Sequence, residues 1–125
     1  MSGSESFDHL PRINLEEALE RSMNSPEFLQ ELADAFVSDN LPKYLPQLQE
    51  AARQRDFEQI TSNAHGLKGG CGAISLTRCR EMAYALEMAG RNRDEETVDR
   101  VLPLLEEEAE QIKKMISNQE LIHHK

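Results

Sequence analysis

The residues most able to do chemistry lie in one stretch near the middle of the chain, Asn63-Ala64-His65-Gly66-Leu67-Lys68-Gly69-Gly70-Cys71-Gly72-Ala73. A helix turns by about 100° per residue, so Ala64, Leu67 and Cys71 share one apolar face, which is expected to be buried. His65 then points away from that face, toward water. An exposed imidazole can act as a nucleophile or a ligand, because its neutral form keeps one unprotonated ring nitrogen.

Four glycines follow His65 within seven residues of this predicted helix. Each costs roughly 1 kcal/mol relative to alanine in a helix interior, so their presence needs a reason. One reason is steric, since bare backbone beside the imidazole admits a second macromolecule. The predicted exposed column contains Glu58, Ser62, His65, Gly69 and Gly72, and Lys68 lies at its edge one turn after His65. An alternative stays open, because glycines also permit close helix packing and a lone surface histidine usually has no chemical role.

Other kinds of site are poorly supported by the sequence. A phosphate-binding loop needs a Gly-Lys pair after a strand, and a dinucleotide-binding fingerprint fails at Ser75. A di-iron bundle needs Glu-x-x-His on two helices, and the one occurrence, Glu120 to His123, falls in the expected tail. We therefore expect no metal and no cofactor. Cys71 and Cys79 fall on apolar faces and are expected to be buried rather than nucleophilic.

The elements that must position His65 are all predicted to be helices. Apolar residues recur with helical spacing, and no β-branched alternation is long enough for a strand. Capping residues predict helix starts after Asn14, Ser25, Asp56, Ser75 and Asp94. Pro42 predicts a kink or restart, and Gly90 predicts a helix end. Short links favour antiparallel neighbours, so the predicted fold class is all-α: an antiparallel up-and-down four-helix bundle with a short additional N-terminal helix.

The length and charge of the chain limit its organisation and its partners. Its 125 residues are enough for one domain, with an expected flexible leader over 1–12, a helical bundle over 13–118 and a tail over 119–125. Fourteen Lys and Arg against 23 Asp and Glu give a formal charge of −9, which disfavours nucleic-acid and anionic-membrane partners. The acidic run Glu106-Glu107-Glu108 is interpreted as a solvated face.

Targeting signals are also absent from the sequence pattern. No apolar run reaches about 18 residues, so no transmembrane helix is expected. Residues 1–8 lack the basic and apolar regions of a secretory signal. With only two cysteines, we expect a reduced, cytoplasmic protein.

At His65-Gly66-Leu67-Lys68-Gly69 the chain resembles the histidine-containing phosphotransfer (HPt) domain of two-component phosphorelays, whose signature is H-x-L-K-G followed by small residues. The resemblance extends over about residues 13–116 through the order and spacing of the helices. Ser75 departs from the glycine that many members have at the turn between the two central helices. Since serine can cap the next helix, this departure leaves the resemblance intact.

The resemblance implies roles for individual residues. His65 would accept the phosphoryl group, Lys68 would help to hold it, and Gly69 would leave room for the partner. On the adjacent helix, Glu87 and Arg91 would lie near the imidazole and phosphate, with Glu87 accepting a hydrogen bond from the ring. The chain would then be a phosphohistidine carrier in a phosphorelay, with no ATP site, and not an enzyme.

The resemblance also implies partners. These would be receiver domains of response regulators and hybrid histidine kinases, with Mg²⁺ supplied by the receiver and the chain acting as a monomer. The expected docking surface combines Ile13, Leu15 and Leu19 of the first helix with Ser62 and Gly72. The apolar members of this set would otherwise only cap the bundle.

Two other functions remain open at the level of sequence. A helical adaptor would dock a receiver or kinase without transferring phosphate. The dimerising hairpin of a histidine kinase would carry an acidic or polar residue after its histidine and a proline further on. Gly66 and the glycines that follow argue against this hairpin.

Overall fold

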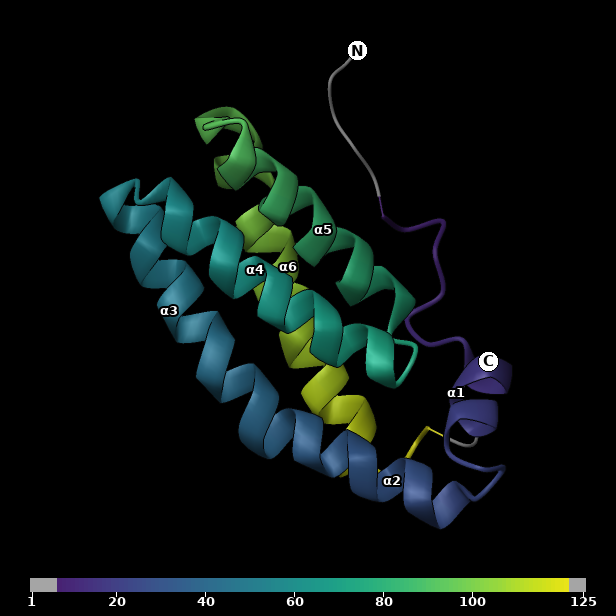
Figure 1. The fold of residues 1–125 in the computed structure, drawn as a ribbon. Helices are drawn as coiled ribbons and strands as arrows, with labels where there is room; N and C mark the ends of the chain where they lie inside the picture. Colours follow the sequence, from purple (N-terminus) through teal and green to yellow (C-terminus); the bar gives the residue numbers. More distant parts are fainter. Residues whose placement is uncertain (1–6, 122–125) are drawn as a thin grey trace.

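The computed structural model describes residues 7–121, and this part of the chain contains helices and no strand (Figure 1). The helices are α1 (Leu15–Arg21), α2 (Pro26–Ala35), α3 (Leu41–Gln54), α4 (Phe57–Ala73), α5 (Thr77–Arg91) and α6 (Glu95–Ser117). A π-helical turn, η1 (Phe36–Asn40), joins α2 to α3 without a loop, so these three segments form one long arm. This arm and α4, α5 and α6 form a four-helix bundle, with α1 at one end. The predicted fold class is confirmed.

Four helices begin at the predicted capping residues. The side-chain oxygens of Asn14, Ser25, Asp56 and Asp94 each accept the backbone N–H three residues ahead, at 3.1–3.2 Å. Such caps satisfy N–H groups that have no partner within the helix. Local chemistry alone therefore fixes where α1, α2, α4 and α6 begin.

The interruption predicted at Pro42 takes the form of the π-helical turn η1. Pro42 lies in the first turn of α3, directly after η1, and it has no N–H group to donate to the preceding helical turn. The chain passes from α2 through η1 into α3, and α3 runs beside α4 (Figure 1). Within residues 7–121, no helix has both the length and the apolar character needed to cross a membrane.

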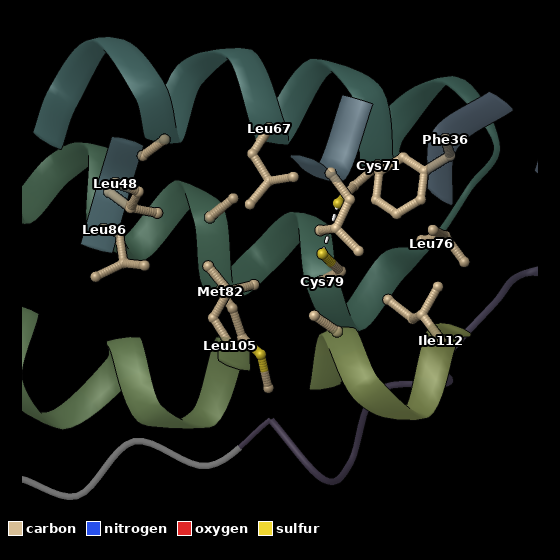
Figure 2. Packing of buried hydrophobic residues seen from close by; sticks show 14 of the residues in the cluster. Phe36, Leu48, Leu67, Cys71, Leu76, Cys79, Met82, Leu86, Leu105 and Ile112 are labelled. Carbon is tan, nitrogen blue, oxygen red and sulfur yellow. Dashed lines mark hydrogen bonds between the residues drawn. The ribbon is translucent and has the colours of Figure 1, made fainter. Parts of the chain in front are cut away.

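The core lies between the α2–α3 arm and helices α4, α5 and α6 (Figure 2). Among these elements, α4 packs most extensively on α5. Ala64, Leu67 and Cys71, the predicted apolar face of α4, are buried, as are Phe57 and Ile60 earlier in the helix and Ile74 just after it. Cys71 on α4 and Cys79 on α5 are free thiols, with their Sγ atoms 2.6 Å apart. Burial raises the pKa of the Cys71 thiol. The prediction that both cysteines serve as buried packing residues is confirmed.

The cap predicted for α5 is wrong, whereas the end predicted near Gly90 is one residue from the observed end. Ser75 does not cap α5, because its backbone is left-handed with φ 57°, and its hydroxyl donates to Glu17 Oε1 at 2.7 Å instead. This conformation explains why a glycine would suit the position. Gly90 lies within the last turn of α5 rather than just after the helix, which ends one residue later at Arg91. A Cβ atom at Gly90 would overlap Thr61, so this glycine serves close packing of α5 on α4.

Part of the segment expected as a flexible leader packs against the bundle, whereas Asp8, His9 and Pro11 are exposed. Phe7 is buried, and the Arg78 guanidinium donates to the backbone oxygen of Leu10 at 2.7 and 3.0 Å. No local pattern of residues indicated this packing, because it depends on contacts between residues about 70 positions apart. Leu121 in the expected tail is also buried. Residues 1–6 and 122–125, which include His123, lie outside the described residues.

The interpretation of the acidic run as a solvated face is wrong for Glu108. Its carboxylate is buried and accepts two hydrogen bonds from Arg12, at 2.7 and 3.0 Å. A guanidinium nitrogen of Arg78 lies 3.7 Å from Glu108 Oε1. Two cations therefore compensate the burial of this charge, and they attach the N-terminal segment to α6.

We predict that Glu108→Ala lowers the free energy of unfolding by about 2–4 kcal/mol, because Arg12 and Arg78 lose the anion that pairs with both. Urea denaturation monitored by circular dichroism measures the change. Glu107→Ala is the matched control, since Glu107 is exposed and its loss should change stability by less than about 0.5 kcal/mol. Equal effects of the two substitutions would contradict this assignment.

Candidate functional site

His65 projects from the solvent-facing side of α4, with 66% of its side chain exposed. Glu58, Ser62 and Gly69 on the same side are exposed as well, and Gly72 is half-buried. The opposite face of the helix carries the buried seam, so the helical period alone accounts for the direction of the imidazole. A partner molecule can therefore reach the ring directly.

The carboxylate of Glu87 on α5 lies beneath the imidazole and organises the site. Its side chain is only 3% exposed, and its Oε2 atom lies 3.1 Å from His65 Nδ1 and 3.0 Å from an Arg91 guanidinium nitrogen. Its Oε1 atom lies 2.7 Å from Lys68 Nζ. One buried anion thus connects the imidazole and two cations from two helices.

The charge state of Glu87 determines which ring nitrogen of His65 is free. Burial by itself raises the pKa of this carboxyl, but the contacts from Lys68, Arg91 and His65 outweigh it and lower the pKa from 4.5 to about 2. Glu87 is therefore ionised at neutral pH and can only accept hydrogen bonds. The 3.1 Å contact then requires a proton on Nδ1, so the neutral ring carries its unshared electron pair on Nε2.

Lys68 occupies the space between two side chains of α5. Besides its ion pair with Glu87, its ammonium lies 5.3 Å from the ring centroid of Tyr84. Both distances are within the range of favourable electrostatic contact. The ammonium and the imidazole therefore contact the two oxygens of the same carboxylate.

The glycines after His65 have two different surroundings. A Cβ atom at Gly69 would meet nothing within 4 Å, and one at Gly72 would meet only Arg80, at 3.6 Å. A Cβ atom at Gly66 or Gly70 would instead overlap a side chain of the α2–α3 arm, Tyr44 or Asn40 respectively. Both explanations offered for the glycine cluster therefore apply, each to different members.

Comparison with known proteins assigns the chain to a family. A family model of the Hpt domain matches residues 27–116, well over half of the chain. The chain belongs to the Hpt domain family. The phosphorelay intermediate protein rdeA of Dictyostelium discoideum is 26% identical over 97 residues, which are 78% of this chain. The alignment covers 38% of that relative, so this chain spans well under half of the relative's length.

A solved structure shows the same fold as this Hpt chain. The crystal structure of histidine-containing phosphotransfer protein B (HptB) from Pseudomonas aeruginosa PAO1 matches with a TM-score of 0.78 and 19% sequence identity. The match covers 93% of this chain and 99% of that chain. At 19% identity this likeness shows a shared fold and does not assign roles to individual residues.

The residues expected to form the docking surface of the Hpt domain differ in their exposure to solvent. Ile13 is only 4% exposed and precedes α1, so it is not the exposed contact that was expected. Leu15 and Leu19 are partly buried and pack against the core. The cause is that α1 covers one end of the bundle, which removes its apolar face from solvent. Ser62 stays exposed on α4, on the side of His65.

A groove of about 360 Å³ beside α4 was not predicted from the sequence. It lies between the α2–α3 arm and the C-terminal half of α4, and its lining includes Leu32, Phe36, Asn40, Tyr44, Gly70 and Ile74. The periodicity of each helix was visible in the sequence, but which faces leave a groove between them depends on helix packing. A mainly apolar groove that reaches Gly70, five residues after His65 on α4, is available to a partner.

Tyr84 was also missed, although part of its signal was present. Tyr84, Glu87 and Arg91 are spaced three and four residues apart, so they share one face of α5. The register that brings this face to Lys68 depends on the turn between α4 and α5, which local patterns do not encode. Within residues 7–121, no group of three or more histidine, cysteine, aspartate or glutamate side chains is arranged to hold a metal ion.

We predict that Gly69→Ala raises the free energy of unfolding by about 0.5–1 kcal/mol, because alanine favours the helix and the new methyl group meets no atom. Gly66→Ala should give no such gain, since the Tyr44 ring must move to accommodate it. Thermal and urea denaturation of the two variants test this difference. Destabilisation by Gly69→Ala would show that this glycine has a structural role.

Proposed function

We propose that this Hpt chain is a phosphorelay intermediate, which accepts a phosphoryl group on His65 from a receiver-domain aspartate and passes it to another receiver. One observation carries the proposal: the Nδ1 side of an exposed imidazole is held by an ionised, buried carboxylate. This arrangement directs the unshared pair of Nε2 toward solvent, where an aspartyl phosphate can approach.

The transfer step is a displacement at phosphorus. Nε2 of His65 attacks the phosphorus, the bond between phosphorus and the aspartyl oxygen breaks, and the aspartate leaves as a carboxylate. The ring keeps its Nδ1 proton and gains positive charge, which Glu87 Oε2 offsets from 3.1 Å. Lys68 lies within one turn of α4 and can offset negative charge on the phosphoryl oxygens, since phosphoryl transfer depends on positioning and electrostatics. The reverse step returns the group to a second aspartate.

In this proposal the receiver domain supplies the Mg²⁺ ion that assists phosphoryl transfer. Glu87 is the buried carboxylate at the imidazole, and its oxygens already contact His65, Lys68 and Arg91. We therefore assign the Mg²⁺ that assists transfer to the receiver. The chain would act as a carrier that obtains phosphate from receivers and has no ATP site, and it would work as a cytoplasmic monomer.

The proposed docking surface surrounds His65. It combines the exposed side of α4, including Ser62 and Gly69, with the neighbouring groove beside Tyr44. Because Gly69 presents bare backbone, a receiver can bring its aspartate close to the ring. The formal charge of −9 on the whole chain does not select among receivers, since exposed acids are spread over many helices.

We predict that incubation with a phosphorylated receiver places acid-labile, alkali-stable phosphate on the wild-type chain and none on His65→Gln. Glutamine retains polarity and approximate size but has no nucleophilic ring nitrogen. Phosphate-affinity gels and mass spectrometry measure the incorporation, and Gln59→Glu, an exposed change on α4, controls for altered surface charge. Equal incorporation by His65→Gln would refute the assignment. If the wild-type chain and His65→Gln bound the receiver equally well and the wild type accepted no phosphate, the chain would instead be an adaptor.

A further inference from the structure

Tyr84 is an exposed aromatic side chain that the proposed transfer step does not yet use. It lies on α5 with 47% of its surface exposed, an unusual position for a large ring in this protein. Its ring centroid lies 5.3 Å from Lys68 Nζ. The attraction between an ammonium and an aromatic face is effective within about 6 Å. Tyr84 therefore interacts with the cation that is nearest to His65 along α4.

The antiparallel course of α4 and α5 explains this arrangement. A step of one turn along α4, from His65 to Lys68, corresponds to a step of one turn back along α5, from Glu87 to Tyr84. Glu87 therefore contacts both His65 and Lys68, whereas Tyr84, one turn earlier on α5, contacts Lys68. The Lys68 ammonium is confined between a buried carboxylate and an aromatic face.

We propose that Tyr84 is a positioning residue for phosphotransfer, whose ring keeps the Lys68 ammonium on the His65 side of α5. This inference rests on the proposed function. A lysine side chain has many rotamers, and freedom at this position would spread the charge over a large volume of solvent. With Glu87 below and Tyr84 behind it, the ammonium remains where the phosphoryl oxygens arrive.

Two substitutions separate the ring of Tyr84 from its hydroxyl. Tyr84→Leu keeps an apolar side chain but removes the aromatic face, and it should slow phosphorylation of His65 by about two- to fivefold, the effect expected of one exposed cation–π contact. Tyr84→Phe keeps the face and should restore the wild-type rate. Because the side chain is exposed, both variants should retain the wild-type melting temperature. An equal loss of rate in Tyr84→Phe would overturn the proposal.

The rate should be measured with two donors. One is a phosphorylated receiver, and the other is phosphoramidate, from which Nε2 displaces ammonia as the phosphorus–nitrogen bond breaks. The small donor needs no protein docking, so Tyr84→Leu should slow both reactions to a similar extent. Slowing with the receiver alone would show that Tyr84 contacts the receiver, and it would overturn the positioning role.

A double-mutant cycle identifies the partner of Tyr84. Lys68→Met removes the charge and keeps a flexible side chain, so adding Tyr84→Leu to it should cause no further loss of rate. A further two- to fivefold loss would contradict the proposal, because Tyr84 would then act without Lys68. The proposed function fails separately, if the wild-type chain accepts phosphate on His65 from neither donor.

Discussion

The buried carboxylate of Glu87 is the interaction on which the site depends. Burial of a charge is unfavourable unless partners surround it, and this anion contacts His65, Lys68 and Arg91 within 3.1 Å. It fixes the tautomer of the imidazole, locates two cations and connects α4 to α5. The same contacts lower the pKa of Glu87 to about 2, so this carboxylate stays ionised throughout the physiological pH range.

The packing of the bundle makes this interaction possible. Close approach of α4 and α5 requires a glycine at position 90, where a Cβ atom would overlap Thr61. On the other side of α4, Gly66 fits against the Tyr44 ring. Helix α4 is thus held from both sides, and its remaining face carries the imidazole and the bare backbone at Gly69. The fold therefore supplies both a rigid support for the nucleophile and open space in front of it.

The parts of this structure that could be predicted from sequence are those set by local rules. Helical periodicity gave the buried seams and the exposure of His65, and side-chain caps gave most helix starts. The burial of Glu108 and Ile13 was not predictable, because it depends on distant segments that cover them. The left-handed backbone at Ser75 follows from the geometry of the turn. The contact of Tyr84 was not predictable either, because its partner, Lys68, lies on another helix.

The most direct test of this account is the protonation of the His65 ring in the free protein. Nitrogen-15 NMR of the imidazole at neutral pH distinguishes the two neutral tautomers. The account predicts a proton on Nδ1, bonded to Glu87, and an unprotonated Nε2. A ring that carries its proton on Nε2 would contradict it, since the nitrogen facing solvent would then have no electron pair with which to attack phosphorus.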